Sequence, residues 1–246
     1  MQDFGDHGYV GLPGFFQGLE LAELQQNVAR FLADVLPSLP SEHVFYEELG
    51  DASTLKQVQQ LGQYDAWFAQ IATHGRVPQL AEQLLGAPVV ARNIQYFNKP
   101  PGSSKPTPPH QDGHYFMLDP CEAVTMWLAL DDVDEHNGCV RYARGPHRRG
   151  MREHEHTNTL GFSRGIVDYP QPLDLECEVA CPAQPGDLLV HHAMTIHRAD
   201  HNQTTDRQRR ALGFIFYSER AREDAAAHAA YQRELAERLR TGGLIT

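Results

Sequence analysis

The chain has 246 residues, 41% of them hydrophobic, and a formal net charge of −11 from 21 basic and 32 acidic residues. This length and apolar content suffice for one well-packed domain, and all-β barrels of this size commonly form one. The negative charge repels phosphate backbones and anionic lipid headgroups, which argues against nucleic-acid and membrane-surface binding. No apolar run approaches the roughly 20 residues needed to cross a bilayer.

The four cysteines show no C-x-x-C spacing, and no charged and then apolar leader opens the chain. Both features predict free thiols in a reducing cytoplasm.

The N-terminal part, about residues 17–87, is predicted to be mostly helical. After a short strand and turn in "FGDHGYVGLPGFFQ", residues 18–36 place apolar side chains three and four apart, which predicts an amphipathic helix. Residues 54–75 predict a second helix that ends at a glycine. Residues 78–86 predict a third, with proline near its start and glycine just past its end.

From residue 88 to about 218 the apolar period changes to two or to short runs separated by turn residues. Many short strands at this spacing predict a β-sandwich or barrel. The strands are expected in "PVVARNIQYFNK", "AVTMWLALDDV", "CVRYA", "ECEVACPAQPGDLLVHH" and "RALGFIFYSER". Residues 219–240 predict a C-terminal helix, and residues 147–178, which lack a clear period, predict a lid or rim over a pocket.

The stretch "HQD" carries the first candidate metal ligands, His110 and Asp112. On a strand, residues i and i+2 project from the same face, so both side chains can point into a barrel. A lone H-x-D is weak evidence, because the chain contains 14 histidines and such pairs arise by chance. A polar loop therefore stays open as an alternative at this point.

A third ligand is found in "PGDLLVHHAMTIHRADHN", where His197 follows an apolar strand. With His110 and Asp112 it would complete the 2-His-1-carboxylate set of non-haem iron sites, which leaves three coordination positions open. His191 and His192 compete, but their place directly after an apolar run favours core or rim histidines. Arg209 starts the next strand and can pair with the far carboxylate of a dicarboxylate cosubstrate.

In this order, "FNKPPGSS", "HQDGHYF", "MWLALDDVDEHNGCVRYARGPHRRG", "PGDLLVHHAMTIHRADHN" and "RRALGFIFYS" resemble the phytanoyl-CoA dioxygenase family of Fe(II)/2-oxoglutarate oxygenases. The likeness runs from about residue 93 to 217. It implies a mainly β fold with flanking helices, a double-stranded β-helix (jelly roll, cupin-like), within a single domain over residues 1–246.

The resemblance also implies the site residues. His110, Asp112 and His197 match the iron ligands, and Arg209 matches the residue for the distal 2-oxoglutarate carboxylate. Contacts to the cosubstrate are carried over to Trp127, Gln111 and, less securely, Gln95. Two departures are that Arg210 rivals Arg209, because the preceding turn looks one residue longer than usual, and that Ala199 replaces a frequent serine. Strand alternation favours Arg209, since Ala211 and Gly213 would share its face and leave room for a ligand.

The implied activity is hydroxylation of a small-molecule C–H bond with Fe(II), 2-oxoglutarate and O2, releasing succinate and CO2. Asp112 argues for oxidation, because related iron halogenases replace this carboxylate with a small residue. The substrate is not readable beyond acyl or amino-acid-like candidates, and neither is the oligomeric state. Two alternatives are a cupin-like metal-dependent isomerase or hydrolase that does not use O2, and a catalytically silent binding protein.

Three further signals stay open. His114 continues the two-residue period and is either a pocket residue or a structural one. "EHEH" at 153–156 lacks a closing cysteine pair, which favours a solvated loop over a zinc site. The basic run at 141–152 predicts either a charged turn or a surface that attracts an anionic substrate.

Overall fold

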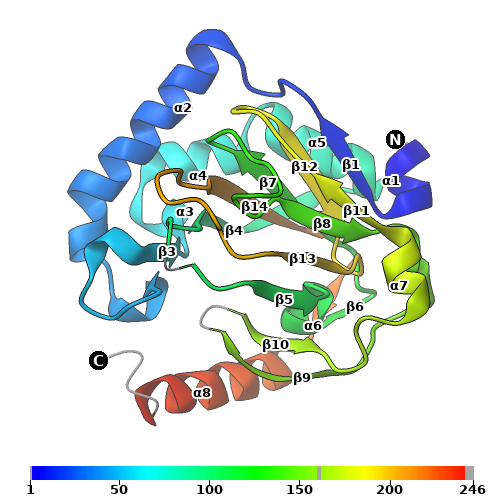
Figure 1. Cartoon of the computed structure of the whole chain (residues 1–246). Helices are drawn as coiled ribbons and strands as arrows, with labels where there is room; N and C mark the ends of the chain where they lie inside the picture. Colours follow the sequence, from blue (N-terminus) through cyan, green and yellow to red (C-terminus); the bar gives the residue numbers. More distant parts are fainter. Residues whose placement is uncertain (1, 103, 160–161, 242–246) are drawn as a thin grey trace.

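Two antiparallel sheets face each other in the computed structural model, which describes residues 2–102, 104–159 and 162–241 (Figure 1). The larger sheet has the order β1 (Tyr9–Leu12), β12 (Leu188–His192), β7 (Ala123–Ala129), β14 (Arg210–Ser218), β4 (Val89–Asn98), β3 (Leu55–Val58) and β2 (Val44–Tyr46). The smaller sheet has the order β11 (Glu178–Cys181), β8 (Val140–Ala143), β13 (His197–Ala199) and β5 (Thr107–His110). This is a double-stranded β-helix, and the predicted fold is confirmed.

The larger sheet is apolar on both faces, and each face has a different partner. Val124, Met126 and Leu128 of β7 belong to the core between sheet and helices, together with Val190 of β12 and Phe214 of β14. The alternate residues Trp127 and Ala129 instead pack against the smaller sheet, with Val140 and Tyr142 of β8. The period-two pattern therefore separates a helix-facing core from the interior between the sheets.

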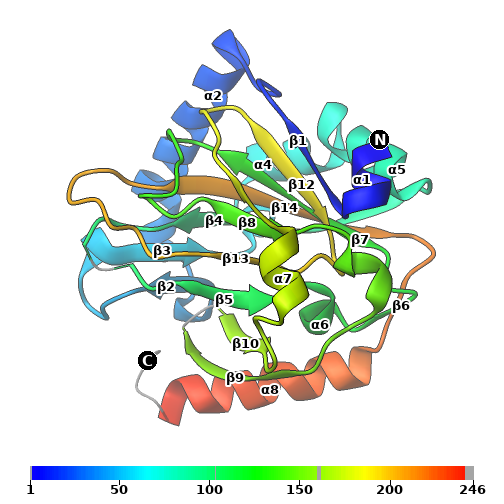
Figure 2. The same ribbon diagram turned by 45° about the vertical axis from the view of Figure 1, so that its right-hand side comes forward.

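Helices enclose the barrel on two sides (Figures 1 and 2). The outer face of the larger sheet is covered by α2 (Gly18–Arg30), α3 (Leu61–Tyr64), α4 (Ala66–Thr73) and α5 (Arg76–Leu85). The C-terminal helix α8 (Ala225–Thr241) lies beside a hairpin of β9 (His154–Thr159) and β10 (Phe162–Ile166). The shorter elements are α1 (Gln2–His7), α6 (Gly113–Phe116), α7 (Pro172–Cys177), β6 (Leu118–Asp119) and β15 (Arg222–Glu223).

The prediction of one helix over residues 54–75 is wrong in its first part. Residues 55–58 form β3, whose four side chains are all buried and which pairs with β4 and β2. As a strand between β4 and β2, residues 55–58 gain backbone hydrogen-bond partners and bury their side chains, which a solvent-facing helix would not allow. Tertiary context therefore overrides the local helical pattern. The helices at 18–30 and 76–85 were predicted, as was the left-handed Gly86 that ends the latter (φ +62°).

The segment 147–178 contains the β9–β10 hairpin and α7, whereas no regular element was predicted there. Its residues 160–161 lie outside the described part. The C-terminal helix is confirmed but begins at Ala225, after β15.

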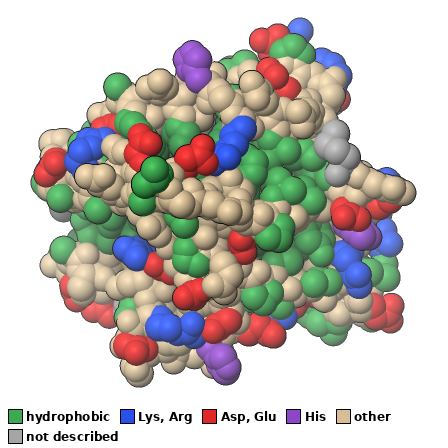
Figure 3. Space-filling view, turned by 90° about the horizontal axis from the view of Figure 1, so that it is seen from above, with side chains coloured by type: hydrophobic (Ala, Val, Ile, Leu, Met, Phe, Trp, Pro, Cys, Tyr) green, Lys and Arg blue, Asp and Glu red, His purple; other side chains and the backbone are tan. Residues whose placement is uncertain are grey.

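The surface seen from above mixes acidic, basic and hydrophobic side chains (Figure 3). Among the described residues, no helix is both long and apolar enough to span a membrane. The single-domain organisation and the cytoplasmic location remain predictions.

Candidate metal centre

The candidate ligands lie between the two sheets, where a cross-strand row of side chains from the smaller sheet faces a similar row from the larger sheet. In the smaller sheet, His197 of β13 pairs in register with both His110 of β5 and Tyr142 of β8. In the larger sheet, Thr125 of β7 pairs with His191 of β12. Because the two rows face each other across the interior, they bring His110, His197, Thr125 and His191 around Asp112.

His110, Asp112 and His197 offer ligand atoms that all lie within 4.8 Å of one another. Asp112 Oδ1 is 3.4 Å from His110 Nε2 and 3.6 Å from His197 Nε2. The Nδ1 atoms lie 2.8 Å from the Pro108 carbonyl and 3.0 Å from the Thr195 carbonyl. Since a carbonyl only accepts, both Nδ1 atoms carry a proton, and both Nε2 atoms, the candidate metal donors, face Asp112.

The strand argument for placing Asp112 is wrong in detail. β5 ends at His110, and Asp112 has helical backbone angles (φ −57°, ψ −34°) at the start of α6. The side chains of His110 and Asp112 converge because the chain turns from β5 directly into α6. The first residue of α6, Gly113, donates its N–H to the Ala193 carbonyl and so holds this turn in place.

The charge states of the set suit a divalent cation. Burial raises the pKa of a carboxyl, but His197, His110 and His191 outweigh this and hold the pKa of Asp112 well below its usual range. Burial, with the neighbouring His110 and His191, lowers the pKa of His197 well below its usual value. One carboxylate beside two imidazole nitrogens is the donor chemistry that Fe(II) sites use, so the residues fit the implied metal.

Gln111 is fully buried and points away from Asp112 into the segment that follows β8. Its amide nitrogen donates to the carbonyls of Gly150 and Met194, and its amide oxygen accepts the Arg152 N–H. All three bonds go to backbone groups. These bonds favour a structural role for Gln111, and its contact with the cosubstrate remains a prediction.

The two neighbouring arginines differ sharply. Arg210 is exposed and pairs with Asp131 at 2.6 Å. Arg209 is buried, its Cζ lies 5.4 Å from the centroid of the Trp127 ring, and its Nε has no partner among the described residues. Burial lowers the pKa of Arg209 to about 10, so the guanidinium stays charged at neutral pH.

Trp127, Gly213 and Gln95 form one cross-strand row, next to the row of Thr125. The Gln95 oxygen accepts from the Gln57 amide at 2.6 Å. A Cβ on Gly213 would lie 2.6 Å from Cε2 of Phe97, so the aromatic ring uses the space that we expected at Gly213 for a ligand. The side chains of Arg209 and Trp127, by contrast, are in direct contact.

The polar partners of Asp112 were not predicted from the sequence. Thr125 Oγ1 lies 2.5 Å and His191 Nε2 3.1 Å from Asp112 Oδ2, and the Tyr142 hydroxyl is 3.0 Å from His191 Nδ1. His191 does prove to be a buried, hydrogen-bonded histidine, as predicted. His191 lies two residues after Leu189, which faces the interior between the sheets, so strand alternation could have predicted that His191 faces the same interior.

His114 and the "EHEH" segment have structural contacts. The rings of His114 and His154 stack at 4.3 Å, and His154 Nε2 accepts the backbone N–H of Gln111. His156 pairs with Glu234 of α8 at 3.0 Å. These contacts give both histidines of the segment a role in holding the hairpin beside α6 and α8.

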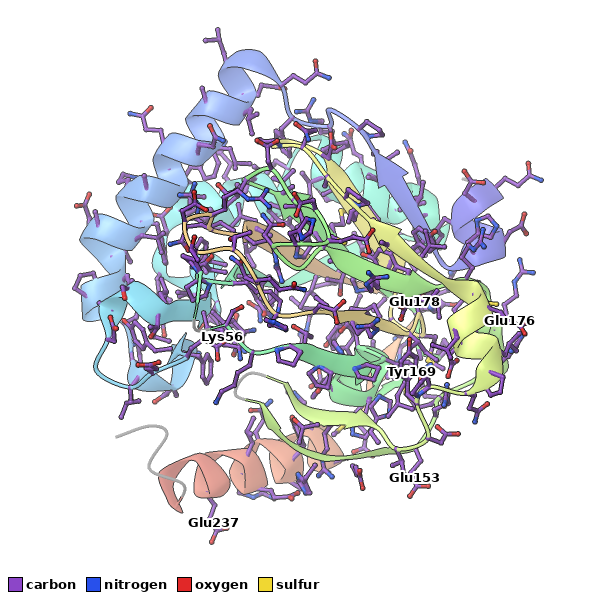
Figure 4. All side chains as sticks on the ribbon, viewed as in Figure 1. Lys56, Glu153, Tyr169, Glu176, Glu178 and Glu237 are labelled. Carbon is purple, nitrogen blue, oxygen red and sulfur yellow. The ribbon has the colours of Figure 1, made fainter. Side chains whose placement is uncertain are left out.

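The basic run is largely paired with carboxylates. Arg141 bonds Asp200 at 3.1 Å, Arg148 bonds Asp6 at 3.1 Å, and Arg152 bonds Asp174 at 2.7 Å. Glu178, which accepts from Tyr169, belongs to the same network (Figure 4). This pairing favours a charged structural surface over an anion-attracting one.

Comparison with known proteins gives concordant results. The family model described as phytanoyl-CoA dioxygenase matches residues 4–211. The peroxisomal phytanoyl-CoA dioxygenase of Homo sapiens is 28% identical over 150 residues, 58% of this chain and 44% of that protein. The 1-deoxypentalenic acid 11-beta-hydroxylase of Streptomyces arenae is 29% identical over 217 residues, 82% of this chain and 74% of that protein.

Among solved structures, the epimerase SnoN in complex with Fe3+, alpha ketoglutarate and nogalamycin RO has a TM-score of 0.71 at 26% identity. That match covers 89% of this chain and 82% of SnoN. The chain spans about half the length of the first curated relatives, 44% of the human protein and 59% of phytanoyl-CoA dioxygenase 1 of Oryza sativa.

Proposed function

The chain belongs to the phytanoyl-CoA dioxygenase family, and on that premise we propose that it is a non-haem Fe(II)/2-oxoglutarate-dependent dioxygenase. It oxidises a C–H bond of a small molecule, with release of succinate and CO2. The observation that supports this best is the combination of His110, Asp112 and His197 with the buried Arg209, whose Nε has no hydrogen-bond partner among the described residues.

His110 and His197, through their Nε2 atoms, and Asp112 would hold Fe(II). When bound, the metal supplies the site at which 2-oxoglutarate and O2 react. The protein orients both imidazoles through their Nδ1 hydrogen bonds and keeps the set away from bulk water, since His110 is only 1% exposed.

Arg209 is the partner for the distal carboxylate of 2-oxoglutarate. A buried guanidinium with an unused N–H donor requires an anion, and a carboxylate satisfies its charge and its fork of donors together. The Trp127 ring lies against the Arg209 guanidinium on one side of this position, and Gln95 belongs to the same cross-strand row as Trp127. Trp127 and Gln95 are therefore proposed as cosubstrate-contacting residues.

Hydroxylation is the favoured outcome, on an acyl or amino-acid-like compound or a related natural product. The relatives named hydroxylase and dioxygenase support it. SnoN, which has a similar fold, is named an epimerase, so an oxidation other than hydroxylation is the alternative outcome. A metal-dependent hydrolase or isomerase without O2 gives no role to the buried Arg209, whose Nε has no partner in the part of the chain that the structure describes.

The proposal is tested by adding Fe(II) and 2-oxoglutarate under anaerobic conditions, which should produce a visible charge-transfer band. His110→Ala and Asp112→Ala should abolish the band and reduce succinate release, measured over a screen of small molecules, at least 100-fold, because each removes a metal donor. His136→Ala, which removes an exposed histidine, serves as the control and should behave as wild type. A wild-type protein that gives neither band nor succinate would contradict the proposal.

A further inference from the structure

The two oxygens of Asp112 have different surroundings. Oδ1 faces the Nε2 atoms of His110 and His197, at 3.4 and 3.6 Å. Oδ2 instead meets the Thr125 hydroxyl at 2.5 Å and His191 Nε2 at 3.1 Å. A carboxylate oxygen accepts along about two lone-pair directions, so these two contacts use the hydrogen-bonding capacity of Oδ2. Only Oδ1 is left facing the other ligands.

The third residue of this arrangement is Tyr142. Its side chain is fully buried, and its hydroxyl lies 3.0 Å from His191 Nδ1. A carboxylate oxygen only accepts, so the hydrogen bond to Asp112 Oδ2 places a proton on His191 Nε2. In this tautomer Nδ1 is the acceptor, and the Tyr142 hydroxyl donates to it.

We propose that Thr125, His191 and Tyr142, here called the carboxylate clamp, are positioning residues that make Asp112 a metal ligand through one oxygen only. The inference rests on the proposed function and adds a constraint to it. A carboxylate that bound through both oxygens would take a further coordination position, whereas 2-oxoglutarate and O2 together need three. The clamp keeps that position open.

The clamp is built into rigid parts of both sheets. Thr125 and His191 are directly paired residues of β7 and β12, and Tyr142 pairs with His197 in the facing sheet. The Tyr142 ring also stacks on that of Tyr9, with centroids 4.6 Å apart and an interplanar angle of 17°. Neither partner of the carboxylate lies on a loop, so the orientation of Asp112 is set before the metal arrives.

The test uses Co(II) alone as the probe, without 2-oxoglutarate or O2, with affinity and visible spectrum as readouts. His191→Phe keeps a ring but removes the donor, and we expect a 10- to 100-fold weaker affinity, the usual effect of losing a partner of a metal ligand, with an altered spectrum. His191→Gln keeps a donor and an acceptor and should recover most of the affinity. Tyr142→Phe should weaken binding less, and this effect should vanish in the His191→Phe background.

Ile215→Val is the matched control, because Ile215 is the apolar neighbour of Thr125 in the same row. It should lower the melting temperature but leave Co(II) affinity unchanged. Wild-type affinity and spectrum in His191→Phe would overturn the clamp alone, as would equal losses in the Phe and Gln variants that track the melting temperature. Failure of the wild-type protein to bind Co(II) would instead overturn the proposed function and, with it, the clamp.

Discussion

Arg209 and Arg210 are neighbours in the chain but lie in opposite environments. Strand alternation places one in the interior and the other at the surface, where Asp131 neutralises it. The interior residue remains charged because its pKa, although lowered by burial, is about 10. A buried charge without a protein partner is costly, so the site is more stable with an anion in place.

Arg209→Leu should therefore weaken 2-oxoglutarate binding while Arg210→Leu should not. Hydrogen bonds to charged groups contribute about 1.5–3 kcal/mol, which corresponds to a roughly 10- to 150-fold higher dissociation constant. Titration of the charge-transfer band with 2-oxoglutarate measures this directly. A large effect of Arg210→Leu with a small effect of Arg209→Leu would reverse the assignment.

At the level of elements, the turn that leads into β12 depends on Gly186. Its φ is +92°, and a Cβ there would lie 2.0 Å from the Phe16 carbonyl oxygen. Its own N–H donates to the Ala129 carbonyl, and its carbonyl accepts from the Phe16 N–H. The turn thus joins the segment after β1 to the end of β7 and sets the register of β12, which carries His191.

Gly186→Ala should destabilise the protein by several kcal/mol, because the backbone of Phe16 must move to admit the methyl group. Gly50→Ala is the matched control, since Gly50 has a similar φ of +88° with no atom within 4 Å of a Cβ. The free energy of unfolding of this variant should fall by only about 1–2 kcal/mol, the cost of a left-handed backbone at a residue with a Cβ. Urea unfolding monitored by tryptophan fluorescence compares the two, and equal losses would show that the contact with Phe16 is unimportant.

For the molecule as a whole, a partly buried histidine, His192, links folding to pH. Burial, with His147 and His191 nearby, lowers the pKa of His192 to about 4. Its Nδ1 accepts the N–H of Met194 at 3.1 Å, a bond that protonation of this atom removes. Between pH 6.5 and about 4 the unfolded chain therefore binds a proton that the folded chain does not, and stability falls as the pH falls through this window.

His192→Asn should reduce this loss, because an asparagine oxygen can accept in place of Nδ1 and does not titrate in this range. The free energy of unfolding of the metal-free protein, measured in urea between pH 7 and 4, should fall less steeply in the variant than in wild type. Parallel curves for the two proteins would rule out His192 as a contributor.

The features that could be predicted from the sequence are the central strands, which follow from local hydrophobic period, and the candidate metal ligands, which follow from the order of motifs. The central strands β4, β7 and β14 were predictable because inward and outward side chains alternate with hydrophobic burial on each face. The order of "HQD", "PGD" and the distal histidine predicted the three residues that the structure brings together. Alternation also distinguished Arg209 from Arg210.

The tertiary structure decided what depends on pairing between distant segments. β3 forms where a helix was predicted, because β4 supplies its backbone partners. The Gln111 amide bonds to backbone groups that follow β8 and β12, at Gly150, Arg152 and Met194, and not to the candidate metal ligands. The contacts of Asp112 with Thr125 and His191 join residues that are 13 and 79 positions away in the chain. No local period encodes such contacts, because they arise only when two sheets bring their facing rows together.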